Sequence, residues 1–86
     1  MNRDILAVTD DLINVIAKHH KDTPEITQIF KNFKISFRYM APELLDTSLP
    51  WERLLSILRI QFPVTEDNMN DPFIMEMMEV VNPSHN

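Results

Sequence analysis

The stretch TPEITQIFKNFKISFRYM, residues 23–40, carries the clearest structural signal in this sequence of 86 residues. It opens with Thr23, a residue type favoured at helix N-caps, and with a proline that suits the first helical turn. Apolar residues then recur at intervals of three and four, the spacing that gathers side chains on one face of an α-helix; they are Ile26, Ile29, Phe30, Phe33, Phe37 and Met40. Burial of each phenylalanine contributes roughly 1.5–3 kcal/mol, so this segment is predicted to supply much of the core. Residues 34–39 also alternate polar and apolar, which leaves an extended end as the alternative.

Prolines and capping residues divide the rest of the chain into three further amphipathic segments. The first spans residues 2–19, the next follows the cluster Asp46-Thr47-Ser48 and runs from 50 to 62, and the last spans 72–81 after Asp71. A short turn is expected from Pro42 to Leu45. The sequence therefore predicts an all-α fold: a single small domain, residues 1–82, of about four short amphipathic helices in a compact bundle or an irregular helical array. Residues 83–86 are predicted to form a short polar C-terminal tail.

Two absent residue types narrow the range of functions. The chain has no cysteine, which excludes disulfides, thiolate metal sites and cysteine nucleophiles. It also has no glycine, and both the phosphate-binding loop and the dinucleotide fingerprint need glycine for a close approach of the backbone. No apolar run is long enough to span a membrane, and acidic residues interrupt the N-terminal apolar stretch where a secretory signal would not tolerate them. A cytoplasmic protein is expected.

Charge is distributed unevenly along the chain. Residues 1–40 hold six basic and five acidic side chains, residues 41–86 hold two and eight, and the net charge is −5. This acidic half is expected to be a solvated surface that also has the potential to orient a partner or a second copy of the chain.

No pattern in the sequence indicates catalysis or metal binding. His19 and His20 are adjacent, so on a helix they point about 100° apart and do not match the i, i+4 spacing of helical metal sites. A solvated helix end is predicted for both. The serines have no histidine at a suggestive spacing, and the acidic pairs Asp10-Asp11 and Glu66-Asp67 would diverge on a helix. We therefore expect no enzyme activity, no catalytic residues, no metal and no cofactor.

The segment Asp46-Thr47-Ser48-Leu49 resembles the prosthetic-group site of acyl carrier proteins, and the resemblance covers about residues 44–81. In that family a serine at the start of a helix in a small acidic bundle carries phosphopantetheine. The resemblance implies that Ser48 would be the attachment point, although Thr47 separates it here from the aspartate that directly precedes the serine in the family. The alternative is that Ser48 only caps the following helix.

The remaining candidates are surfaces that contact a partner. The last helix is apolar on more than one side, which favours an interface at Ile74, Met75 and Met78. Trp51 is a second candidate anchor, because tryptophan is frequent among interface hot spots. Lys31, Lys34 and Arg38 form a short basic stripe, which also raises the alternative of a weak nucleic-acid-binding regulator. The interpretation we favour is a small regulatory protein, of accessory or inhibitor type, that binds a partner protein and could form a homodimer.

Overall fold

The computed structural model describes residues 4–82, and within that range the regular secondary structure is entirely helical. The helices are α1 (Ile5–His19), α2 (Pro24–Arg38), α3 (Pro42–Leu45), α4 (Leu49–Gln61) and α5 (Pro72–Val81). The predicted all-α fold is confirmed, and the turn expected after Pro42 is the four-residue helix α3. The tail predicted for residues 83–86 lies outside the described range.

Capping explains where two of the helices begin. The Asp4 carboxylate accepts a hydrogen bond from the Leu6 N–H at 2.9 Å, and the Asp71 carboxylate accepts one from the Phe73 N–H, also at 2.9 Å. Each carboxylate satisfies an amide that has no partner within its helix and lies at the positive end of the helix dipole.

The cap predicted at Ser48 is wrong in one respect. Ser48 occupies the N-cap position of α4, but its hydroxyl donates to the Glu52 carboxylate at 3.1 Å and caps no backbone amide. The hydroxyl of Thr47 accepts the hydrogen bond from the Leu49 N–H instead, at 3.2 Å. The backbone at Ser48 is already helical, so its side chain is directed along α4 and away from the free amides.

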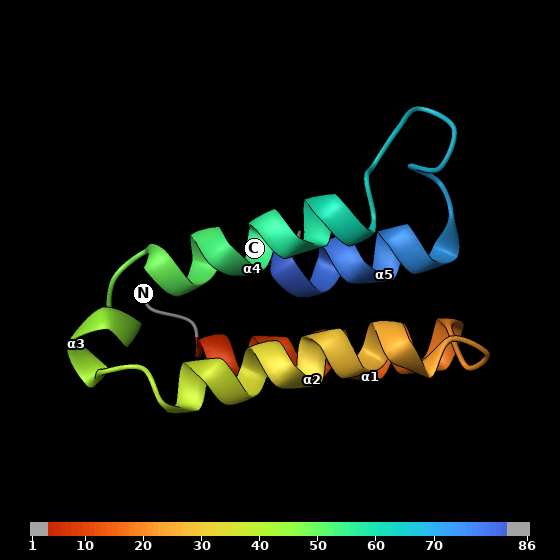
Figure 1. The fold of residues 1–86 in the computed structure, drawn as a ribbon. Coiled ribbons are helices and arrows are strands. Elements are labelled where there is room, and N and C mark those ends of the chain that lie inside the picture. Colours follow the sequence, from red (N-terminus) through yellow and green to blue (C-terminus); the bar gives the residue numbers. More distant parts are fainter. Residues whose placement is uncertain (1–3, 83–86) are drawn as a thin grey trace.

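The long helices form two antiparallel pairs, α1 with α2 and α4 with α5, stacked on one another (Figure 1). Helix α1 packs most extensively against α2 and α5, whereas α4 approaches its neighbours less closely. Helix α2 remains helical to Arg38, so the extended alternative for residues 34–39 is excluded. Phe30 and Phe37, predicted as core residues, are fully buried beside Leu12, Ile16 and Leu54. Phe33 is only partly buried at the edge of this core.

An aromatic cluster joins the C-terminal end of α4 to the other helices. The Phe62 ring lies 6.1 Å from Phe30 of α2 and 4.8 Å from Phe73 of α5, between ring centroids. Because rings at such distances add to the energy of simple burial, Phe62 fixes this end of α4 against both pairs of helices.

Candidate functional site

The apolar last helix, α5, divides its residues between the core and the surface. Ile74 is 4% exposed and belongs to the core, so the structure removes it from the predicted interface. The reason is that α5 packs extensively against α1, and its buried face includes Ile74 beside Phe73 and Met77. Met75 and Met78 are 56% and 45% exposed, so both remain accessible.

A groove of about 390 Å³ lies between α4 and α5. Its floor consists of the buried side chains Leu58, Phe62 and Met77, and its rim consists of Leu55, Arg59, Val64, Met78 and Val81. Arg59 is the one charged residue in this lining. Of the predicted interface residues, only Met78 lines the groove. Sequence reasoning missed Leu55 and Arg59, although their i, i+4 spacing places them on the same side of one helix.

The loop that closes one end of the groove is held by a single asparagine. The Asn68 side-chain oxygen accepts from the Thr65 N–H at 2.8 Å, and its nitrogen donates to the Pro63 carbonyl at 2.9 Å. These two bonds fix the backbone beside Val64, which is 47% exposed at the groove rim. Side-chain hydrogen bonds thus order a loop that has no glycine. Asparagine side chains commonly form such bonds to the backbone in turns.

The basic stripe on α2 is only partly available to a partner. Lys34 forms an ion pair with Asp10 of α1, and its side chain is 17% exposed. Lys31 and Arg38 are exposed. Pairing of Lys34 across the α1–α2 contact leaves two exposed cations in the stripe, fewer than the several phosphate contacts from which nucleic-acid binding draws its affinity.

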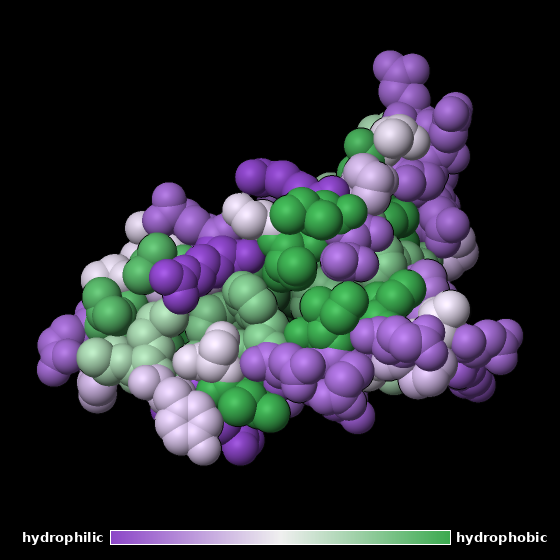
Figure 2. Space-filling view, in the orientation of Figure 1, coloured by the Kyte–Doolittle hydropathy of each residue, from purple (hydrophilic) through white to green (hydrophobic). Residues whose placement is uncertain are grey.

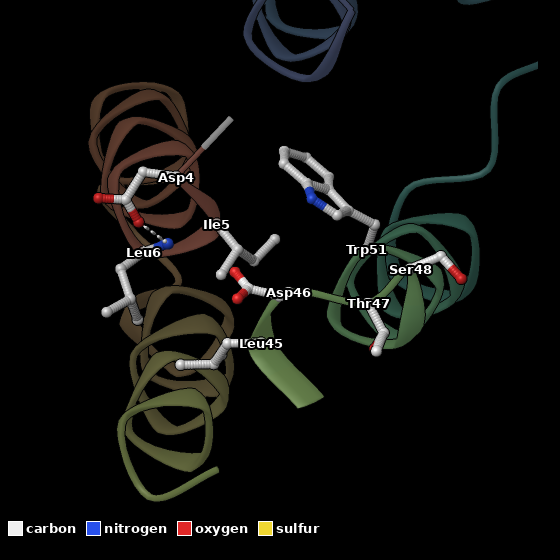
Figure 3. A pocket seen from close by; sticks show the side chains of 8 residues that line it. All are labelled: Asp4, Ile5, Leu6, Leu45, Asp46, Thr47, Ser48 and Trp51. Atoms are coloured by element: carbon white, nitrogen blue, oxygen red, sulfur yellow. Dashed lines mark hydrogen bonds between the residues drawn. The ribbon is translucent and has the colours of Figure 1, made fainter. Parts of the chain in front are cut away.

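A second hollow, of about 520 Å³, lies at the end of the bundle where α1 begins and α4 starts. In Figure 3 the half-buried Trp51 indole projects into the space between α1 and α4, and the Asp46 carboxylate lies beside Ile5 across that space from Trp51. Asp4 points back to its own helix, where it caps Leu6. Ser48 also lines the hollow, so the structure brings two of the residues singled out from the sequence to one place.

Of the two histidines at the end of α1, His19 is exposed as predicted, and the prediction of a solvated side chain is wrong for His20. The His20 ring stacks on Phe62 at 5.3 Å and meets Phe73 edge-on at 4.6 Å, measured between centroids, and its Nε2 is buried with no hydrogen-bond partner in residues 4–82. The His19 Nε2 lies 3.0 Å from Glu76 Oε1. The prediction failed because the end of α1 packs against α5 and the end of α4, which sequence spacing does not reveal.

Glu76 is held by two partners from α1. Its other carboxylate oxygen accepts a hydrogen bond from Lys18 Nζ at 2.6 Å. The hydrogen bond from Lys18 lowers the pKa of Glu76 below its ordinary value of 4.5, and the contact with His19 lowers it further. These contacts link α1 to α5, so a structural role in the fold is sufficient to explain Glu76 and its partners.

Comparisons with protein-family models, with curated proteins and with solved structures found no match to this chain. Within residues 4–82, no group of three or more His, Asp or Glu side chains is placed to hold a metal ion. In the same range, no helix has the length and apolar character that crossing a bilayer requires.

Proposed function

We propose that this protein acts by binding another protein, and that the partner docks in the groove between α4 and α5. The observation that carries the proposal is the groove itself, which combines a buried apolar floor with exposed Val64 and Met78 and a single cation, Arg59. Methionine and arginine are enriched at protein interfaces, and methionine adapts its shape to a bound side chain.

The groove sets the chemistry of the partner. A surface between two antiparallel helices suits an amphipathic helix whose apolar residues recur at i, i+3 or i+4 and i+7. Arg59 at the rim favours a carboxylate beside those apolar residues, because a charge-assisted hydrogen bond there would fix the orientation of the bound segment. The preferred partner is thus a helix with an apolar face and an acidic residue at its edge.

Pre-ordering of the site supports a binding role. Asn68 holds the loop that carries Val64, and Leu58, Phe62 and Met77 of the floor are already buried in the core. A site that is ordered before it is occupied loses less conformational entropy on binding, so more of the contact energy is available as affinity. Accessory or inhibitor proteins, which act by occupying a partner's surface, depend on such affinity.

The test uses two methionines of the same helix. Amphipathic helical peptides are selected from a display library against the protein, and their affinities are measured for the wild type, Met78→Glu and Met75→Glu. Met78 lines the groove and Met75 does not, while both are exposed to a similar degree. We expect Met78→Glu to weaken binding at least about tenfold and Met75→Glu to leave it nearly unchanged. Selected peptides that tolerate Met78→Glu, or that lose binding equally in both variants, would place the site elsewhere.

A further inference from the structure

The opposite flank of α4 carries a second apolar surface, formed together with α2. It comprises two rows of residues at i, i+4 spacing or close to it, Glu25-Ile29-Phe33 on α2 and Arg53-Ile57-Ile60 on α4. Between the rows lies a shallow groove of about 330 Å³ lined by Phe33, Arg53, Ile57 and Ile60 together with Glu52 and Ser56. Ile60 is 71% exposed, the highest value among the large aliphatic side chains of residues 4–82.

The two rows form one continuous face. Helices α2 and α4 run antiparallel along the front of the molecule in Figure 1, and Figure 2, in the same orientation, shows hydrophobic surface along the line where they meet, with hydrophilic surface toward both ends. Because α4 does not approach α2 closely, the side chains between them are only partly covered. Residues such as Ile60 are therefore in contact with water in the isolated chain, which is unfavourable for an apolar side chain.

Two of the charges on this face, Glu25 and Arg53, are arranged to complement a second copy of it, while the carboxylate of the third, Glu52, accepts a hydrogen bond from Ser48 of its own chain. The rows run in opposite directions, so Glu25 lies at one end of the face on α2 and Arg53 lies at the other end on α4. Both are exposed, and within residues 4–82 neither forms an ion pair. A two-fold axis that lies in the plane of the face, perpendicular to the line from Arg53 to Glu25 and through its midpoint, places each arginine on the partner's glutamate and brings the apolar centres of the two faces together. An interface of this kind is isologous, with residue i on j and j on i.

We infer that this protein forms a two-fold symmetric homodimer through the α2–α4 face, with reciprocal Arg53–Glu25 pairs at the two ends of an apolar centre. An interface that covers about one tenth of the molecular surface of 6005 Å² would bury about 600 Å² on each copy, at the low end for a specific interface, so weak, concentration-dependent association is expected. The dimer leaves the α4–α5 groove uncovered, because Leu55 and Arg59 lie on the other side of α4.

Substitutions that exchange the charges of Arg53 and Glu25 test the inference. Sedimentation velocity at about 5 µM and about 500 µM, in low salt, is expected to show a shift from monomer to dimer for the wild type. Arg53→Glu and Glu25→Arg each replace two attractive pairs by two repulsive ones and should weaken association about tenfold, whereas the double variant should restore it. Circular dichroism checks that every variant keeps its helix content, because Glu25 also lies favourably in the first turn of α2.

Arg59→Glu is the matched control. It introduces the same change on the same helix but on the groove side, so dimerisation should be unaffected while binding of an acidic peptide in the groove is lost. A wild type that stays monomeric at about 500 µM overturns the inference. So does a dimer that Arg53→Glu does not weaken, or one that the double variant fails to restore. None of these outcomes bears on peptide binding at Met78, so the two proposals fail separately.

Discussion

Replacement of His20 by phenylalanine is expected to stabilise this protein. The His20 ring already occupies an aromatic site, stacked on Phe62 and edge-on to Phe73, while its buried Nε2 has no hydrogen-bond partner in the described chain. A buried polar atom without a partner costs about 1–3 kcal/mol of desolvation, and an apolar ring of similar shape avoids that cost. The backbone contribution is kept, because the His20 N–H donates to the Ile16 carbonyl at 2.8 Å whatever the side chain.

The net gain is smaller than the full desolvation term, because the phenyl ring is slightly larger and the site is closely packed. We expect an increase of about 1 kcal/mol in the free energy of unfolding, which for a domain of this size corresponds to a rise of about 4–8 °C in Tm. Urea denaturation followed by circular dichroism measures the first quantity and calorimetry the second.

The neighbouring histidine supplies the control. His19→Phe removes the contact of 3.0 Å with Glu76 and replaces a polar ring at the surface by an apolar one, so it should lower Tm. Opposite signs for the same substitution at adjacent positions would follow directly from the two environments. A free energy of unfolding for His20→Phe below that of the wild type would refute the reasoning, since it would mean that the buried nitrogen contributes a favourable interaction.

Two further predictions concern the stability of the bundle. Glu76→Gln should lower Tm at pH 7, and the difference in Tm from the wild type should disappear in acid. Lys18 and His19 lower the pKa of Glu76 in the folded state. A carboxylate of this kind stabilises the fold above its unfolded pKa and loses this contribution as the pH falls through the folded pKa. Thermal unfolding of both proteins between pH 7 and pH 3 measures this, and a difference that grows in acid would contradict it. Phe30→Ala should cost about 3–5 kcal/mol because Phe30 is fully buried, whereas Ile35→Ala, at a position 48% exposed, should change stability by less than about 0.5 kcal/mol. Equal effects of the two substitutions in urea denaturation would show that the packing described for α2 is incorrect.

The role proposed for α4 depends on its position between two surfaces that are not fully covered, the α4–α5 groove and the α2–α4 face. Helix α1 is covered by α2 and α5, so its apolar face is used entirely in folding. Helix α4 has a narrow buried face around Leu54 and Leu58, and apolar or cationic residues stand on both sides of it. In the two proposals, one flank binds a partner helix and the other contacts a second copy of the chain, so a single helix would organise both interactions.

The sequence by itself determined the helices of this protein. Proline and capping residues mark where α2, α4 and α5 begin, and a period of three to four residues in the apolar positions identifies the buried side of each. Helix formation depends on neighbours in the chain, so these features were predictable, whereas the choice between a helical and an extended end at residues 34–39 was left open by the sequence and decided by the structure. The exposure of Met75 and Met78 was also within reach, because both fall outside the stripe that contains Phe73 and Met77.

Only the tertiary structure decided which partly apolar surfaces are covered. Ile74 is buried and Ile60 is exposed although both are isoleucines on the edge of an apolar stripe, because α5 packs extensively against α1 and α4 stands further from its neighbours. His20 is enclosed because the ends of α1, α4 and α5 meet there. Periodicity specifies the direction of a side chain from its own helix axis, but the distance to the next helix depends on side chains remote in sequence. That distance determines whether the apolar side chains between two helices are fully covered or remain exposed in a groove.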